Sequence, residues 1–363
     1  MSKSPKLLLG SRKGLITLAQ NGKGWRVENE AHVGNPVAYA DYDAEQNNLW
    51  ATLDHGHWGQ KLQRSRDHGK TWEEVPAPKY PEHLELKPGK PATLRYLWVL
   101  GFGGRQYPQR LLAGTEPGGL FQSDDNGASF HLVESLWNHP SRVDKWMGGG
   151  RDEAGIHSIV LDPRKKGRYL LGISCAGVFE TTDDGKSWTP RNQGLVADFM
   201  PDPNIDVGHD VHFMTACPAN PDVIWQQNHC GVFRSVDGAK SWQAVSQKGD
   251  LHHFGFSIAV DAKNPDVAWN IPAEGDSKRV SPGKASVVCR TENGGKSWTA
   301  LRQGLPQENC YDISLRHAFA IHGRQLAFAT TTGNVFYSGD GGEGWQCLGN
   351  HFPPVYSVRF GSF

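Results

Sequence analysis

A phrase of eight residues recurs along almost the whole of this chain of 363 residues. Most copies begin with Ser or Thr, carry Asp or Asn two positions later, then a glycine, and end on an aromatic ring. The final aromatic residues lie at positions 25, 72, 130, 188, 242, 298 and 345, so the spacing is about 50 residues, which is typical of a repeat architecture. The copies occupy residues 65–72, 123–130, 181–188, 235–242, 291–298 and 338–345, with a decayed copy at 18–25.

Each copy has the residues of a β-hairpin turn. The copy at 181–188 follows the β-rich run 177–180, and further β-rich runs precede the other copies. An Asp side chain accepts hydrogen bonds from turn N–H groups, and glycine supplies a positive φ. The closing aromatic ring then packs on the sheet. We therefore expect each phrase to join the third and fourth strands of a small antiparallel sheet.

In consensus form the phrase is S/T-x-D-x-G-x-S/T-W, which is the Asp-box. On these motifs the chain resembles the Asp-box (BNR-repeat) β-propeller superfamily over nearly its whole length. That group includes sialidases, sortilin-type receptors, xyloglucanases and a photosystem II assembly factor. The resemblance implies a sialidase-like, glycosyl hydrolase-like fold, but these members share turns rather than chemistry.

The β-rich runs between the phrases allow the blades to be counted. Six inner strands are expected at 37–42, 94–100, 156–161, 211–216, 255–260 and 316–321. A seventh blade is split, with 355–360 at one end of the chain and 6–10 and 14–18 at the other. Pairing the two ends removes two exposed sheet edges. The sequence predicts an all-β, seven-bladed β-propeller forming a single domain over 1–363; a six-bladed propeller is the alternative.

Composition limits the classes of partner and compartment. The chain has 38 basic and 38 acidic residues, which favours neither a nucleic acid nor a membrane surface as partner. No apolar run approaches the roughly 18 residues that span a bilayer, and the three leucines near the start are too few for a signal peptide. The six cysteines lack metal-type spacing, so we expect reduced thiols and a cytoplasmic protein. No nucleotide cofactor is indicated.

Because strand direction alternates, all the phrases lie on one face of the ring. The starts of the inner strands and the long connections 131–154 and 189–210 lie on the opposite face. Long loops are usually functional. We therefore expect the active face opposite the Asp-boxes.

Histidines gather in segments of that opposite face. His157, His212 and His317 each stand second in an expected inner strand, so they occupy equivalent positions in three blades. Imidazole ligands from separate blades suit Zn or Fe first and can leave a position open for substrate. A metal-free alternative is acid–base catalysis by histidine. The predicted metal ligands are His157, His212 and His317, with His229, His253, His55 and His57.

Acidic, basic and aromatic residues of the same segments complete the predicted site. The candidates for catalysis are Asp54, Glu116, Glu153, Asp210 and Glu274. The candidates for substrate binding are Arg12, Arg95, Arg151 and Trp58.

These residues predict a small-molecule enzyme, with a hydrolase first and a small molecule or saccharide as ligand. A metal-dependent oxygenase, an exo-sialidase-like glycosidase and a non-catalytic protein-binding platform are the alternatives. The sialidase F/Y-R-I-P motif is missing, and the nearest phrase is LRYL at 94–97. Xyloglucanases build their cleft between two propellers, whereas this chain has the repeats of one.

Overall fold

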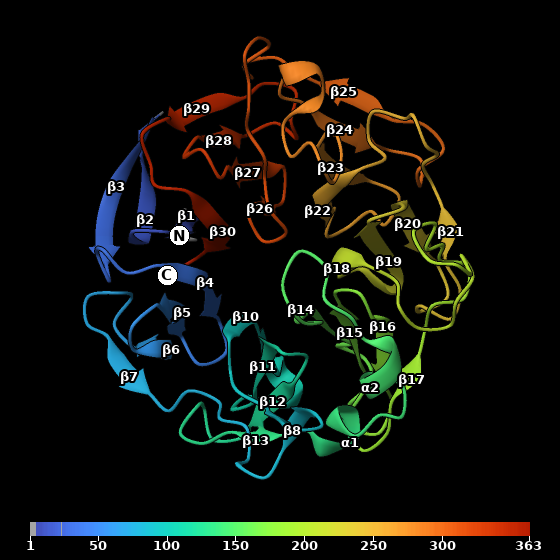
Figure 1. Cartoon of the computed structure of the whole chain (residues 1–363). Coiled ribbons are helices and arrows are strands. Elements are labelled where there is room, and N and C mark those ends of the chain that lie inside the picture. The colour runs from blue at the N-terminus through green and yellow to red at the C-terminus, as the bar shows by residue number, and fades with distance from the viewer. Residues whose placement is uncertain (1–4, 23) are drawn as a thin grey trace.

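Seven four-stranded antiparallel sheets stand in a ring around a central axis (Figure 1). The computed structural model describes residues 5–22 and 24–363. The predicted all-β, seven-bladed propeller is confirmed, and the six-bladed alternative is excluded. Residues 1–4, at the start of the segment considered for a signal peptide, lie outside the described residues, as does Lys23 in the decayed copy at 18–25.

Each blade is named here by its innermost strand, and its strands follow one another from the axis outward. The first four blades along the chain are β4 (Val37–Asp43), β5 (Asn48–His55), β6 (Gly59–Ser65) and β7 (Glu73–Val75); β10 (Tyr96–Phe102), β11 (Leu111–Glu116), β12 (Leu120–Ser123) and β13 (His131–Leu132); β14 (Ile156–Leu161), β15 (Tyr169–Ile173), β16 (Gly177–Thr181) and β17 (Thr189–Pro190); and β18 (Val211–Cys217), β19 (Asn220–Asn228), β20 (Gly231–Ser235) and β21 (Gln243–Ala244).

The remaining blades complete the ring. They are β22 (Gly255–Val260), β23 (Ala268–Pro272), β24 (Val288–Thr291) and β25 (Thr299–Leu301); β26 (Phe319–His322), β27 (Gln325–Ala329), β28 (Val335–Ser338) and β29 (Gln346–Gly349); and β30 (Val355–Gly361), β1 (Lys6–Ser11), β2 (Gly14–Asn21) and β3 (Gly24–Ala31). Outside the blades lie the hairpin β8 (Glu85–Lys87) and β9 (Lys90–Pro91), the short helices α1 (Glu134–Trp137) and α2 (Arg142–Lys145), and the 3-10 turns Gly104–Gln106 and Pro282–Lys284.

The two ends of the chain close the ring. Strand β30 pairs antiparallel with β1, from Lys6 opposite Gly361 to Ser11 opposite Val355. The amino and carboxyl ends accordingly lie near each other in Figure 1. Ring closure by the terminal strands, as predicted, leaves no unpaired inner edge at the junction.

One expected inner strand differs from the structure. Strand β26 begins at Phe319, so residues 316–318 form part of the connection that leads to it. His317 forms an isolated parallel bridge to Ser357 and precedes the strand instead of standing second in it. The run RHAFAI has the hydrophobic pattern of a strand, but its register with β27 begins only at its fourth residue, Phe319.

The repeated phrase forms the same hydrogen-bonded turn in six places. The hydroxyl oxygen of its first residue accepts the N–H of its fifth residue at 2.8–2.9 Å. Its third residue accepts the N–H of the seventh at 2.8–3.1 Å. The third residue is Asp in five turns and Asn293 in the sixth. Each turn therefore satisfies its own backbone donors with two short side chains.

The turn that follows β16 shows why its residue types are needed. Gly185 has a φ of 80°, and a Cβ atom there would lie 2.7 Å from the hydroxyl of Tyr169. The ring of Trp188 then packs edge-on against Tyr169, with ring centroids 5.4 Å apart. Glycine permits both the backbone conformation and the close approach, and the tryptophan fastens the turn to its own blade.

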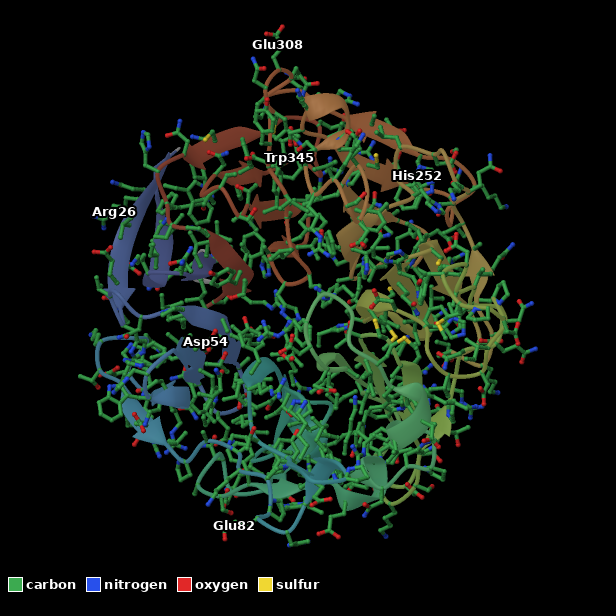
Figure 2. All side chains as sticks on the ribbon, viewed as in Figure 1. Arg26, Asp54, Glu82, His252, Glu308 and Trp345 are labelled. Atoms are coloured by element: carbon green, nitrogen blue, oxygen red, sulfur yellow. The ribbon has the colours of Figure 1, made fainter. Side chains whose placement is uncertain are left out.

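Two further features bear on the expectations from composition. All six cysteines are free thiols. None of the helices in the described part of the chain is long and apolar enough to cross a membrane. Figure 2 shows Asp54 nearer the axis than Arg26, Glu82 and Glu308, which lie at the rim of the ring.

We predict that Thr181→Val destabilises the protein by about 1–3 kcal/mol, because the N–H of Gly185 loses its acceptor in a buried turn. The neighbouring Thr182 is exposed, so Thr182→Val serves as the matched control with little effect. Urea unfolding of the two variants and the wild type measures the difference. Equal stability of the two variants would show that the hydroxyl is dispensable.

We also predict an acid-sensitive contribution from these turns. The donors of Ser187 lower the pKa of Asp183 to about 2, and those of Ser129 do the same for Asp125. A carboxyl whose pKa is lower in the folded state stabilises the protein above its unfolded pKa of about 4, and that contribution is lost as pH falls toward 2. In Asp183→Asn, the unfolding midpoint in urea should fall less steeply between pH 4 and 2 than in the wild type.

Candidate functional site

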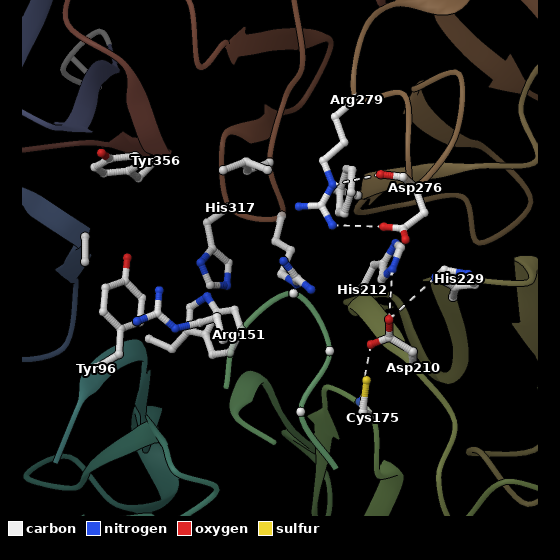
Figure 3. Close-up of a pocket in the computed structure, with 18 of the residues that line it drawn as sticks. Tyr96, Arg151, Cys175, Asp210, His212, His229, Asp276, Arg279, His317 and Tyr356 are labelled. Carbon is white, nitrogen blue, oxygen red and sulfur yellow. Dashed lines mark hydrogen bonds and ion pairs between the residues drawn. The ribbon is translucent and has the colours of Figure 1, made fainter. Parts of the chain in front are cut away.

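The mouth of the central tunnel opposite the hairpin turns opens into a cavity of about 790 Å³. Every blade contributes to its wall, from inner-strand starts and from the loops between second and third strands. Figure 3 shows this wall, with Tyr96 and Arg151 on one side and Asp210, His212 and Arg279 on the other. A cavity therefore opens on the face that was expected to be active.

Near the start of six inner strands, one extra residue forms a β-bulge that faces this mouth. In β14, Ile156 lies opposite Ile173 and Ser158 opposite Gly172, which leaves His157 without a partner of its own. A bulge redirects the side chain of the extra residue. The equivalent bulged residues are Ala38, Trp98, His157, His212, Phe256 and Tyr356, and all but His157 line the cavity.

Two of the equivalent histidines bind the next blade. Nε2 of His157 donates to the carbonyl of Val211 at 2.8 Å, and Nδ1 of His212 donates to that of Gly255 at 2.6 Å. Val211 and Gly255 are the first residues of the following inner strands. These two side chains therefore each connect their own blade to the following one.

His317 connects across the axis. Its Nε2 donates to the carbonyl of His157 at 2.8 Å, and its ring packs edge-on against Tyr39 and Phe213. Burial and the charge of Arg359 lower the pKa of His317 to about 3. Tyr39 and Phe213 line a second cavity of about 780 Å³ at the other end of the tunnel. His317 thus stands as a neutral plug between two cavities, and the structure does not bring His157, His212 and His317 to one centre.

A different group of ligand-type residues does come together. One atom from each of Asp210, His212 and His229 lies within 4.8 Å of the others, and no other three His, Cys, Asp or Glu residues in 5–22 and 24–363 do so. Oδ2 of Asp210 lies 3.3 Å from Nε2 of His212 and 3.7 Å from Nδ1 of His229 (Figure 3). All three residues line the cavity.

The surroundings orient these three side chains. Oδ1 of Asp210 accepts from the hydroxyl of Ser174 at 3.0 Å and from the N–H of Cys175 at 3.3 Å, which leaves Oδ2 for the two imidazoles. The bond from Nδ1 of His212 to Gly255 turns Nε2 toward Asp210, where it donates to the carboxylate when protonated and is free to bind a metal ion when it is not. Metal-binding histidines are commonly held by such a bond from the other ring nitrogen.

The charge states favour the same chemistry. Burial alone would raise the pKa of Asp210, but His212, Arg316 and Ser174 together hold it well below the usual range. Burial and the neighbouring His212 lower the pKa of His229. At neutral pH the cluster thus pairs an ionised carboxylate with a neutral imidazole at His229, the forms that bind metals or accept protons.

Other predicted residues lie around the cluster or away from it. Asp54, Arg12 and Arg151 line the cavity. His253 and Glu274 line a neighbouring cavity of about 560 Å³ that shares His229. The predicted residues that line neither are Glu116, Glu153, Arg95, Trp58, His55, His57 and His157.

The predicted residues outside the cavity have identifiable partners. Glu116 is buried in an ion pair with Arg151, and Glu153 pairs with Lys90 at 2.8 Å. Arg95 pairs with Asp152 at 3.3 Å.

In the loop after β5, the N–H of Trp58 donates to Nδ1 of His55 at 3.1 Å, and the exposed ring of Trp58 packs edge-on against His57. These contacts are local to the loop.

Arg316, which lines the cavity beside His317, was not among the predicted site residues. It carries no repeat signal because it lies in the irregular connection before β26. Its position immediately before a predicted histidine ligand was the one hint available.

Comparison with known proteins supports the fold. No protein-family model matches the chain. The chain is similar to the oligoxyloglucan-reducing end-specific xyloglucanase of Emericella nidulans, with 26% identity over 214 residues, or 55% of this chain and 24% of that enzyme. The match therefore spans about a quarter of that enzyme's length.

Solved structures agree on the architecture. A GH74 enzyme of Niastella koreensis matches 96% of this chain and 65% of its own, with 14% identity and a TM-score of 0.56. A structure of YCF48 bound to D1 peptide matches 86% of this chain and 81% of its own, with 15% identity and a TM-score of 0.51. At these identities the likeness shows the propeller fold.

We predict that His157→Phe destabilises the protein by about 1–3 kcal/mol, because the buried carbonyl of Val211 loses its donor. Burial holds the pKa of His157 well below its usual value, so the ring acts as a neutral donor. Urea unfolding measures the loss in free energy of unfolding, and His157→Gln should lose less than His157→Phe because its amide can still donate. A change in bound metal without a change in stability would instead make His157 a ligand.

Proposed function

We propose that the protein is a hydrolase whose reaction takes place at Asp210, His212 and His229. The observation that carries this proposal is the convergence of the three side chains within 4.8 Å on the wall of a 790 Å³ cavity. A cavity of this size suits a small ligand such as a short saccharide. The similarity to a xyloglucanase, partial though it is, supports a saccharide as the substrate.

We further propose that the cluster holds a divalent metal ion, with Zn or Fe first. Two imidazoles and a carboxylate are a ligand set used by catalytic zinc and iron sites, which keep other positions open. A bound ion would lower the pKa of a water ligand and supply a nucleophile near neutral pH. Ser174, Cys175 and Gly255 would orient the ligands through the contacts that they already make.

The same residues could act without a metal. Asp210, an ionised carboxylate held beside His212, could itself act as the general base. The two arrangements differ in what they need, because only the first requires an added ion. Asp54, on the opposite wall, is the second carboxylate available to a glycosidase mechanism.

We also propose that the chain is an Asp-box (BNR-repeat) propeller. Support comes from the six turns, in which the first and third residues of the phrase make equivalent hydrogen bonds. The phrase would then be a structural device on the face away from the cavity.

A metal-dependent oxygenase is the second candidate function. The specific observation that favours it is the ligand set, since two histidines and one carboxylate also bind non-haem iron in oxygenases. Oxygen uptake by the Fe²⁺-loaded protein, with no hydrolysis by the Zn²⁺-loaded protein, would favour this candidate.

A non-catalytic binding platform is the remaining alternative. It would be favoured if a partner protein still bound to every variant with a substitution in the cavity.

We predict that His229→Ala weakens metal binding by more than about 100-fold, since loss of an outer partner alone costs about 10–100-fold. Protein made without a histidine tag would be stripped with a chelator and titrated with Zn²⁺ and Fe²⁺. His253→Ala is the matched control, because His253 lines the neighbouring cavity and lies outside the cluster.

Hydrolysis of nitrophenyl glycosides and esters should fall in parallel in Asp210→Asn and His229→Ala, and be unchanged in His253→Ala. Hydrolysis by the stripped protein that is lost only in Asp210→Asn would support the metal-free arrangement. A protein that binds neither metal, with hydrolysis unchanged in both cluster variants, would contradict the proposal.

A further inference from the structure

Arginine side chains and aromatic rings alternate across the cavity wall. The guanidinium of Arg151 lies 5.7 Å from the ring centroid of Trp98, and that of Arg316 lies 5.1 Å from the same ring. Arg316 also lies 5.6 Å from the ring of Phe256, which Arg279 approaches to 5.4 Å. Three guanidinium groups are thus interleaved with two aromatic rings, with Arg316 at the centre.

The outer two arginines have carboxylate partners. Arg151 pairs with the buried Glu116, and Arg279 pairs with Asp276 at 2.9 Å (Figure 3). These pairs balance the charge of Arg151 and Arg279. They also fix the direction of the two side chains at the edges of the row.

The central arginine has no such partner. Among residues 5–22 and 24–363, no hydrogen bond or ion pair of Arg316 is found, and its Nε is buried without an acceptor. Asp210 acts on Arg316 through its field alone, because its two oxygens face Ser174, Cys175 and the histidines. Arg316 keeps only the cation–π contacts with Trp98 and Phe256.

Such an arrangement is costly in the protein alone. Arg316 is only partly exposed, so its charge is less well solvated than in water, and without a hydrogen-bonded partner it destabilises the folded state. Burial, together with the like charges of Arg279 and Arg151, lowers the pKa of Arg316, although a guanidinium stays protonated in practice. Free donors of a planar guanidinium match a carboxylate or phosphate group in geometry and charge. An anionic ligand would supply the acceptors that Arg316 lacks in the protein alone.

We propose that Arg316 binds an anionic group of the ligand, a carboxylate or a phosphate, between the flanking Arg151 and Arg279. This proposal deepens the proposed function, on which it rests for the reaction, because it names the substrates as anionic small molecules such as acidic or phosphorylated sugars. The anchored group would place the rest of the molecule on the wall that carries Asp210, His212 and His229. Arg316 acts in binding and takes no part in proton transfer.

Binding is tested with D-glucuronate, D-glucose 6-phosphate, inorganic phosphate and neutral D-glucose at one ionic strength. The quenching of tryptophan fluorescence, to which Trp98 contributes, and calorimetry report binding on the intact protein. At least one anionic sugar should bind about tenfold or more tightly than glucose, since a charge-assisted hydrogen bond is worth about 1.5–3 kcal/mol. Preference for glucuronate identifies a carboxylate, and preference for glucose 6-phosphate or phosphate identifies a phosphate. Equal binding of glucose and the anions would overturn the proposal.

Arg316→Met should abolish the preference for anions while leaving the melting temperature in the absence of ligand unchanged or raised, because an unpaired, partly buried charge is replaced by an apolar chain. A merely structural arginine would instead lower that temperature. Arg105→Met is the matched control, since Arg105 is 93% exposed and lies on the opposite end of the tunnel. Arg316→Lys retains the charge and should keep part of the preference if the methionine variant does not fold. Anion preference that persists in Arg316→Met would overturn the proposal.

The outcomes separate this inference from the proposed function. Anion binding that depends on Arg316, in a protein that hydrolyses nothing, would leave the anion site standing and remove the hydrolase. Hydrolysis at the Asp210 cluster with equal use of neutral and anionic sugars would do the reverse.

Discussion

The antiparallel pairing of β30 with β1 is the interaction on which the remaining structure depends. It joins residues from the two ends of the chain, and it converts seven separate sheets into a closed ring. The same strand also shapes the interior. Tyr356 lines the cavity that contains Asp210, and the guanidinium of Arg359 donates to the carbonyl of His317 at 2.9 Å. Loss of this strand would therefore open two sheet edges and release the residue that occupies the axis.

Within the closed ring, the bulges of the inner strands decide which side chains meet. A regular strand would send alternate residues into the two neighbouring blade cores. One extra residue near the start of six strands redirects a single side chain per blade, and in five of the six that side chain lines the cavity at the mouth of the tunnel. The blades can thus keep a common core and turn while the bulged position varies from alanine to tryptophan. Chemistry at the mouth is therefore largely independent of the packing that holds the blades.

The sequence was sufficient to predict the ring and the face that carries the Asp210 cavity. The reason is that the turn phrase depends on side chains that few other residues can replace. Local spacing specified these elements, as at Thr181, Asp183 and Gly185. The site was harder, because it depends on where side chains from distant blades point. His157 and His212 are equivalent in sequence and in structure, yet each ring binds the following blade. His317 lies outside its expected strand, and Arg316 stands in an irregular connection that no periodic pattern marks. Of the predicted ligands, His212 and His229 lie together with the predicted acid Asp210.

The hydrogen bond from His317 to the carbonyl of His157 decides how a ligand can enter and leave the central tunnel. This bond spans the axis between the two cavities. The tunnel is therefore blocked at its centre, and each cavity opens at one end only. Whatever enters beside Asp210 must leave by the same opening. One molecule must then leave through this opening before the next can enter. The glycines at 148–150 line the same cavity. For a reaction in such a cavity, as proposed above, slow release of the product would limit turnover unless its altered charge or shape weakened its binding to the wall.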